Sequence, residues 1–254
     1  NIKFRMLKKG IFVFAFIWNF LVSAQQYSES FISSIESLKE QNNYSEFIYV
    51  HLDEFAKNST VENLNIYKNL ESNLWREPIN NEEKVAQLYF YINYAYQLKV
   101  FGNINQSINY YEKGYSLYKQ NSINYDIIEY CLKPLANNYT RLGDVDRAED
   151  IIKITIEKAI EEKNENQIAS GYLNLAAVFR IKGNYTMAIN YLNLALLNAN
   201  SNSHKAKIHS DLAINYLFLN DLDKSEKEAI LSNKLNFPLL TYDINRIKNL
   251  SKKK

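Results

Sequence analysis

The chain has 254 residues, of which 46% are hydrophobic, and it contains only six glycines and three prolines. This composition allows a mostly helical globular protein and excludes a loop-rich protein that cradles phosphates with glycines. The formal net charge is +2, and basic residues are scattered outside the short tail Lys252–Lys254, which argues against nucleic acid as the main partner.

Residues 1–24 are predicted to be a signal peptide. The basic pair Lys8-Lys9 precedes an apolar run over residues 11–22, and Val22-Ser23-Ala24 has the small-x-small pattern of a cleavage site. Asn19 interrupts the run, which leaves about half of the ~20 residues that a membrane-spanning helix needs, so a membrane anchor is the less favoured alternative. We expect an exported protein without a membrane span after cleavage, located in the periplasm, on the outer-membrane surface or outside the cell.

Residues 27–76 are predicted to form a degenerate N-terminal helical repeat that caps the fold. Helices are expected over residues 28–40 and 44–57, on either side of a turn at Asn42-Asn43. A third helix is expected over residues 60–76, with Ser59 as its candidate N-cap.

Residues 82–236 follow a polar break and are predicted to form four helix pairs. Helices are expected over residues 82–101 and 104–120, 124–142 and 145–163, 166–182 and 185–200, and 204–219 and 222–236. A closing helix over residues 238–251, with apolar residues on one side, is predicted to cap the end of the array.

Four turn residues mark the junction inside each pair: Gly102, Gly143, Gly183 and Asn220, at intervals of 41, 40 and 37 residues. Gly or Asn at such a position can take the left-handed conformation that ends a helix. Residues at fixed distances from each turn share their size. Small residues lie seven before it (Ala95, Ala136, Ala176, Ala213) and five after it (Ser107, Ala148, Ala188, Ser225), and large ones lie eight before it (Tyr94, Leu135, Leu175, Leu212) and four before it (Leu98, Tyr139, Phe179, Tyr216).

A fixed period of this length is typical of a solenoid. Small residues let the two helices of a pair approach closely, and large ones fill the space between successive pairs. Because no single pair can bury its apolar face alone, the pairs must stack. We therefore predict an all-α fold, a right-handed α-solenoid of stacked antiparallel helix pairs.

The four copies resemble tetratricopeptide repeats, most clearly in two stretches. These are Leu135-Ala136-Asn-Asn-Tyr139-Thr-Arg-Leu-Gly143-Asp144, followed by Ala148, and Leu175-Ala176-Ala-Val-Phe179-Arg-Ile-Lys-Gly183-Asn184-Tyr185, followed by Ala188. The spacing exceeds the 34 residues usual in that family, which implies helices longer by about a turn. The stretch from Cys131 to Asp144 is also similar to repeats that precede caspase-like CHAT peptidase domains in exported bacterial proteins. We expect no such domain here, because the sequence to Lys254 leaves no residues for it.

The resemblance implies that the first helix of each pair lines a concave, peptide-binding groove. Counting back from each turn residue places the following side chains on that face: Tyr89, Ile92, Asn93, Tyr96, Lys99, Tyr130, Lys133, Asn137, Arg141, Ser170, Leu173, Asn174, Ala177, Arg180, Lys207, Ser210, Ile214 and Leu217.

Four of these residues, Lys133, Asn137, Asn174 and Lys207, fall at positions that resemble the carboxylate clamp of some family members. Ammonium and amide donors would converge there on the terminal carboxylate of a peptide. The fifth clamp position, usually Arg, is Asp211 in this chain and opposes an anion. A groove that binds peptides in another way and a surface without a ligand both remain open.

No group of residues in the sequence supports catalysis, a cofactor or a metal site. His204 and His209 are five residues apart and do not share a helical face as a zinc pair would, and no nucleophile elbow or phosphate loop occurs. Cys131, the single cysteine, is expected to be a buried and inert thiol. Pro134 falls inside a predicted helix, where it is expected either as a tolerated kink or as a bend that shapes the groove.

The leading hypothesis is an exported scaffold or adaptor that binds a protein or peptide partner in its concave groove and is not an enzyme. One alternative is a regulatory or sensory segment of a larger protein, such as a CHAT-type peptidase or a signalling protein. A second alternative is an enzyme with an unfamiliar site. The sequence does not indicate the oligomeric state.

Overall fold

The computed structural model describes residues 27–235, and all regular secondary structure in that range is helical. The predicted signal peptide and the predicted closing helix both lie outside the described residues. Contacts divide the chain into two compact units, Asn1–Phe90 and Tyr91–Lys254, with the boundary inside helix α5 (Asn81–Val100). The predicted all-α fold is therefore confirmed for the described part of the chain.

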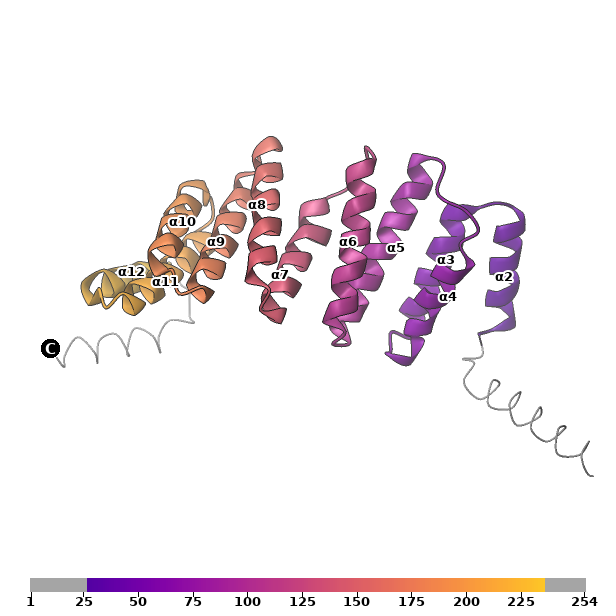
Figure 1. Cartoon of the computed structure of the whole chain (residues 1–254), viewed down its shortest axis with the longest axis horizontal. Helices are drawn as coiled ribbons and strands as arrows, with labels where there is room; N and C mark the ends of the chain where they lie inside the picture. Colours follow the sequence, from indigo (N-terminus) through magenta and orange to yellow (C-terminus); the bar gives the residue numbers. More distant parts are fainter. Residues whose placement is uncertain (1–26, 236–254) are drawn as a thin grey trace, which may run out of the picture. The chain divides into compact units, whose positions relative to one another are not determined.

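The first unit contains the helices α2 (Glu29–Glu40), α3 (Tyr44–Lys57) and α4 (Asn65–Asn73), the short 3-10 helix η1 (Glu62–Leu64) and the start of α5 (Figure 1). The turn between α2 and α3 is at the predicted place. Asn42 has a φ of 55°, and the side chain of Asn43 accepts a hydrogen bond from the backbone N–H of Glu46. The core of this unit is aromatic, with Phe47, Phe55 and Tyr67 fully buried.

The prediction of one helix over residues 60–76 was wrong in its start, its end and its cap. The Ser59 hydroxyl donates to the carbonyl of Phe55, at 3.3 Å, and so belongs to the end of α3. The first turn after it is the 3-10 helix η1, and the chain is extended at Leu74, just after α4.

An ion pair fixes the segment between α4 and α5. The guanidinium of Arg76 donates to both carboxylate oxygens of Glu83, at 2.6 and 2.8 Å, and the backbone N–H of Ile79 donates to the same carboxylate at 2.8 Å. Arg76 also donates to the Asn42 side chain at 3.0 Å and lies over the Tyr44 ring. The irregular segment is thereby held against the turn between α2 and α3 and the start of α5.

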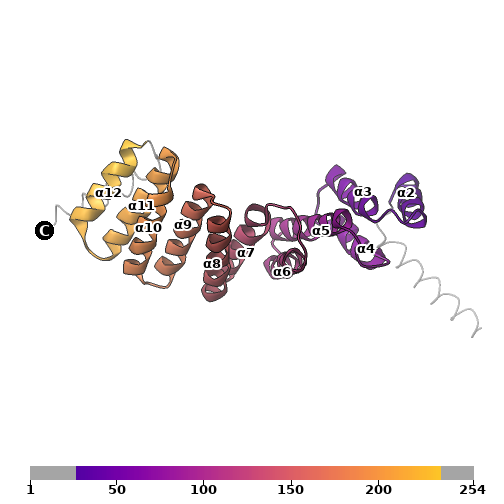
Figure 2. The same cartoon turned by 90° about the horizontal axis from the view of Figure 1, so that it is seen from above.

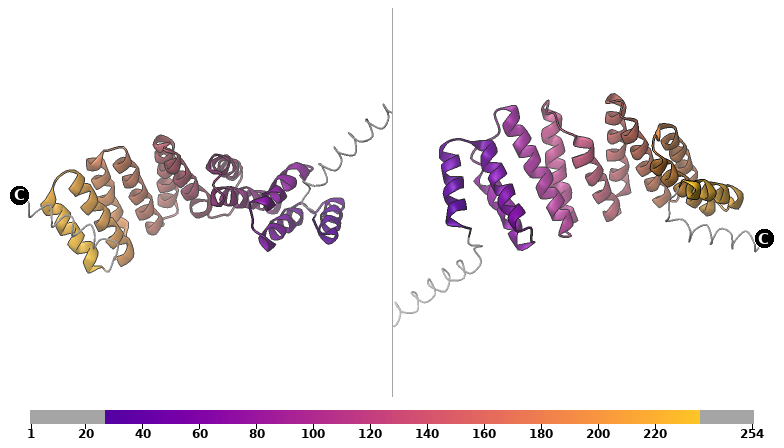
Figure 3. Two further views of the ribbon diagram at one scale, coloured as in Figure 1. Left: turned by 90° about the horizontal axis from the view of Figure 1, so that it is seen from below. Right: turned by 180° about the vertical axis from the view of Figure 1, so that it is seen from behind.

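The second unit continues with α6 (Ile104–Gln120), the π-helical segment η2 (Ile128–Leu132), α7 (Lys133–Leu142), α8 (Val145–Glu161), α9 (Glu165–Ile181), α10 (Tyr185–Asn198), α11 (Asn202–Phe218) and α12 (Leu222–Lys234). Contacting helices follow chain order, from α6 against α7 to α11 against α12. Figures 2 and 3 show the same succession of short-looped helices from above, from below and from behind.

All four predicted turn residues adopt the left-handed conformation. Gly102, Gly143 and Gly183 have φ values of 85°, 80° and 75°, and Asn220 has a φ of 60°. The residue after each turn, Asn or Asp, then caps the next helix by accepting a hydrogen bond from a backbone N–H three residues further on. A single dipeptide thus ends one helix and starts the next.

The small and large positions pack as the repeat pattern predicts. The large residues eight before each turn and the small residues seven before and five after it are all buried, as are Leu98 and Tyr139 four before it. The Ser107 hydroxyl donates to the carbonyl of Ala95, at 2.6 Å, and Ser225 does the same to Ala213, at 2.7 Å. A serine at this position therefore fits the narrow space between the helices and keeps its hydroxyl satisfied.

The helix predicted over residues 124–142 contains a wide turn. Through Ile128–Leu132 the backbone is π-helical, and the N–H of Lys133 bonds to the carbonyl of Ile128, five residues back. Pro134 follows in the first turn of α7, where its missing N–H is tolerated because the regular hydrogen-bond ladder restarts there. The expectation of a simple kink inside a regular helix is corrected to a π-helical segment that precedes the proline.

Candidate functional site

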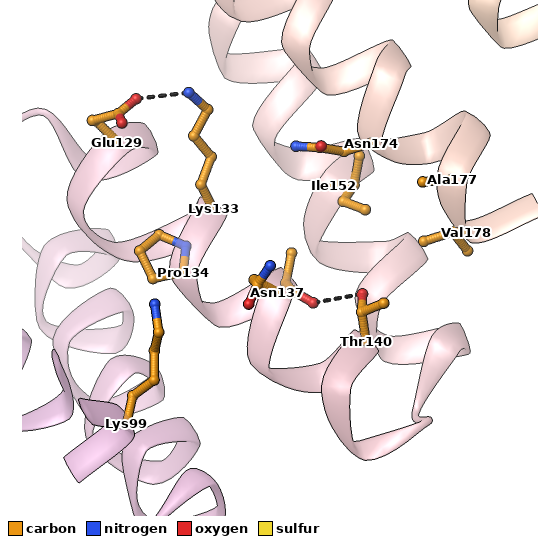
Figure 4. A pocket seen from close by; sticks show the side chains of 11 residues that line it. Lys99, Glu129, Lys133, Pro134, Asn137, Thr140, Ile152, Asn174, Ala177 and Val178 are labelled. Carbon is orange, nitrogen blue, oxygen red and sulfur yellow. Dashed lines mark hydrogen bonds and ion pairs between the residues drawn. The ribbon is translucent and has the colours of Figure 1, made fainter. Parts of the chain in front are cut away.

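The second unit contains a cavity of about 380 Å³ where the end of α5 meets η2, α7, α8 and α9. Figure 4 shows it from close by. Its polar side chains are Lys99, Glu129, Lys133, Asn137, Thr140 and Asn174, and its apolar lining is Pro134, Ala136, Ile152, Ala177 and Val178.

The cavity brings together four residues predicted for the groove: Lys99, Lys133, Asn137 and Asn174. They come from the first helices of three successive pairs, because one side of the stack presents those helices. Ala177, also predicted there, lines the cavity as well. Five other residues predicted for the groove do not line the cavity: Asn93, Tyr96, Arg141, Arg180 and Lys207.

The two lysines of the cavity differ in their electrostatic surroundings. Lys133 forms an ion pair with Glu129, at 2.7 Å, and this lysine holds the pKa of the Glu129 carboxyl below its usual value. Gln167 donates to the same carboxylate at 3.2 Å. In the part of the chain that the structure describes, Lys99 has no carboxylate within ion-pair distance and its ammonium lies 5.8 Å from the centre of the Tyr96 ring. The uncompensated charge of the cavity therefore resides on Lys99.

Two amide side chains line the same cavity as these charges. Asn137 and Asn174 are exposed, and neither makes a side-chain hydrogen bond to another described residue. Thr140, in contrast, donates its hydroxyl to the carbonyl of Ala136, at 2.9 Å (Figure 4). The cavity thus combines two amides, each with a donor and an acceptor, with the ammonium group of Lys99.

The carboxylate-clamp arrangement does not assemble around this cavity. Lys207 donates to both oxygens of Asp211, at 3.0 and 2.9 Å, so its charge is already neutralised one helical turn away. The residue at the fifth clamp position is therefore the partner of a clamp lysine.

Two residues expected in the groove are instead buried. Ile92 and Ser210 both lie ten residues before a turn residue and both belong to the core. A residue ten positions before the turn faces the neighbouring helices, so only a long side chain there, such as that of Lys133, reaches the solvent. The groove assignment was wrong for these two residues.

Cys131 is buried, as predicted. Its thiol donates to the carbonyl of Tyr111, at 3.3 Å, and burial raises the pKa of the thiol to about 12. A thiol that stays protonated at neutral pH is not a nucleophile. No group of three or more metal-ligating side chains occurs within residues 27–235, and no helix there is long and apolar enough to cross a bilayer.

The fold is similar to several solved structures at low sequence identity. BtubC (BKLC) from P. vanneervenii aligns with a TM-score of 0.61 and 16% identity, over 81% of this chain and 88% of that one. The apo form of RapI aligns with a TM-score of 0.63 and 17% identity, over 80% of this chain but only 58% of RapI. A putative kinesin light chain from Podosopora anserina with nearly identical TPR-like repeats aligns with a TM-score of 0.55 and 12% identity, over 79% of this chain and 95% of that one.

No family model matches the sequence, and no curated protein matches it. The structural similarities and the repeat geometry together show an α-solenoid fold of the tetratricopeptide type. In such a fold, stacked helix pairs present an extended surface.

Proposed function

We propose that this chain is an exported adaptor that binds an extended segment of a partner protein in the cavity formed by α5, η2, α7 and α9. The observation that carries the proposal is the convergence of Lys99, Asn137 and Asn174 from three successive helix pairs on one solvent-accessible cavity. These groups are not engaged by other side chains in hydrogen bonds or ion pairs within the described range.

The chemistry of the cavity suits a peptide. A carboxamide side chain can donate to a backbone carbonyl and accept from a backbone N–H, so Asn137 and Asn174 can bind the main chain of an extended segment. Lys99 supplies a charge-assisted hydrogen bond to a carboxylate. Ile152 and Val178 in the lining offer apolar contact to a side chain. The expected partner segment therefore combines an extended backbone with an acidic group.

The adaptor proposal includes export, which the pattern over residues 1–24 supports: a basic start, an apolar run and a small-x-small site. Expression with a C-terminal tag, followed by cell fractionation and determination of the N-terminus of the mature protein, tests this part. Mature protein that begins at Gln25 in an envelope or extracellular fraction supports it, and uncleaved protein in the cytoplasm contradicts it.

Capture of partners from an envelope extract tests the cavity. The chain is compared with a Lys133→Glu/Asn137→Ala variant and with a matched control, Lys227→Glu/Asn190→Ala. The control makes the same change in charge and side-chain size on exposed positions of α10 and α12 that do not line the cavity. Loss of captured proteins in the first variant alone supports the proposal. The same set of proteins on all three baits contradicts it.

The alternative function is a regulatory or sensory segment of a larger protein. The sequence feature behind it is the similarity of residues 131–144 to repeats that precede CHAT peptidase domains. Antibodies raised against residues 91–235 and used on native cell extract distinguish the two functions. A band much larger than 29.8 kDa supports the alternative.

A further inference from the structure

The first helix of every pair in the second unit ends on an exposed large apolar residue. The last residues of α5, α7, α9 and α11 are Val100, Leu142, Ile181 and Phe218. Their exposed fractions are 53%, 46%, 56% and 57%. The second helices of the same pairs end on polar residues, Gln120, Glu161, Asn198 and Lys234, and exposed apolar residues occur near only two of these ends, at Ile160 and Leu197.

These four helix ends belong to one continuous edge. Lys99 at the first turn lines the same cavity as Thr140, close to the second turn. Lys182 at the third turn forms an ion pair with Asp146, at the start of the helix after the second turn. The Phe218 ring stacks on the Tyr185 ring beside the third turn, with centroids 4.7 Å apart. Contacts therefore connect each turn to the next along the unit.

The edge also carries an excess of positive charge. A basic residue directly precedes the exposed apolar one at three turns: Lys99 before Val100, Arg141 before Leu142 and Arg180 before Ile181. None of these three cations has a carboxylate within ion-pair distance in the described chain, whereas Asp144, Asp146 and Asp221 on the same edge are all paired with cations. Asp223 near the fourth turn is without such a cation, so the positive excess belongs to the first three turns.

We propose that this edge docks on an anionic lipid surface. The apolar helix ends enter the headgroup region, and the long basic side chains beside them extend to the lipid phosphates. A flat, negatively charged surface matches a single row of apolar side chains with flanking cations. A protein partner matches it less well, because protein interfaces need a broad patch of roughly 800 Å² per partner and are enriched in Tyr and Trp at their centre.

Vesicle co-sedimentation tests this inference, with the chain beginning at Gln25 so that the apolar run of residues 11–22 does not contribute. The vesicles contain phosphatidylethanolamine with phosphatidylglycerol, and neutral controls contain phosphatidylcholine alone. We expect binding to the anionic vesicles only. Each cation near such a surface contributes about five-fold in affinity, so Arg141→Gln/Arg180→Gln lowers binding by about twenty-five-fold.

An apolar variant and a matched control separate the edge from general hydrophobicity. Leu142→Gln/Ile181→Gln is expected to lower binding on the order of tenfold. Leu197→Gln, at a residue that is 82% exposed near the opposite end of its helix pair, is expected to leave binding unchanged. Circular dichroism confirms that the variants keep their helices.

The inference is overturned if the unmodified chain stays in solution with anionic vesicles, if it binds neutral vesicles equally well, or if Leu197→Gln lowers binding as much as the edge variant. Neither edge variant changes a residue that lines the cavity, so loss of lipid binding and loss of partner capture are separate results.

Discussion

Gly171 is the position where the stacking of helix pairs depends most directly on a missing side chain. A Cβ atom added there would lie 2.4 Å from Cγ1 of Ile156, which is buried on α8. Real Cβ atoms essentially never make so close a contact, and Cγ1 is bonded to the branched Cβ of Ile156 rather than standing at the free end of a flexible side chain. The packing of α8 against α9 would therefore have to shift.

The expected cost of Gly171→Ala is the difference between two effects. Overpacking a well-filled core costs about 1–3 kcal/mol, and replacing glycine with alanine inside a helix returns about 1 kcal/mol. The net loss is then about 0–2 kcal/mol and does not by itself identify the contact. Ile156→Ala removes the opposing Cγ1 and costs about 2–5 kcal/mol through the cavity that it leaves.

A double-mutant cycle isolates the contact. In Gly171→Ala/Ile156→Ala the new methyl group occupies space that the isoleucine has vacated, so the combined cost is expected to fall below the sum of the single costs by about 1–3 kcal/mol. Urea unfolding of the four proteins, followed by circular dichroism, measures it. Costs that add within about 0.5 kcal/mol would show that Ile156 and Gly171 do not press against each other.

Three further results are expected. Glu83→Gln lowers the free energy of unfolding by about 1.5–3 kcal/mol at neutral pH, because Arg76 loses a charged partner. Arg76 lowers the pKa of Glu83 in the folded protein, so the ion pair stabilises the fold fully above the unfolded-state pKa of Glu83 and ceases to do so as the pH falls through its folded-state pKa. Urea unfolding midpoints measured against pH will show this loss. Asn220→Gly raises the unfolding midpoint slightly, because its φ of 60° favours glycine, and a lower midpoint would contradict the left-handed turn. Cys131 reacts with a thiol reagent in denaturant but not in buffer at neutral pH, since burial raises the pKa of the thiol to about 12, and fast labelling of the native chain would refute its burial.

The sequence was sufficient to predict the helix pairs because their signals are local and repeated. A left-handed glycine followed by a capping Asn or Asp is encoded in two adjacent residues, and four copies of the pattern confirm one another. The irregular elements lack such repetition. The 3-10 turn at Glu62–Leu64 occurs once, and Pro134 indicates that the helix is disturbed without indicating that the disturbance is a π-helical turn ahead of it.

The cavity was predicted in part. Counting from the turn residues selected Lys99, Lys133, Asn137 and Asn174, which line one cavity because the first helices of the pairs share one register. The net charge of that face depends on ion pairs within single helices, which counting from the turn residues does not reveal. Glu129 with Lys133 and Lys207 with Asp211 are each four residues apart, a spacing that could have indicated the ion pairs. The Arg76–Glu83 pair spans a non-helical segment and had no periodic signal.

The exposed apolar helix ends were also missed, although each lies one or two residues before a turn residue that the sequence identified. Burial was inferred from the positions that agree between copies, and these residues differ in identity from one copy to the next. The property that these residues share is their exposure to solvent, and only the structure shows it.

The wide turn before Pro134 holds one residue more than an ordinary helical turn. Deleting a residue from Ile128–Leu132 would let the backbone close into a regular α-helix, and everything upstream would then rotate by about 100° about the axis. The Glu129–Lys133 pair would have to form over three residues instead of four, and the Cys131 thiol would rotate away from the carbonyl of Tyr111. The proline ring would meet the carbonyl four residues before it. The five-residue π-helical segment Ile128–Leu132 therefore determines the direction in which the polar side chains before it point.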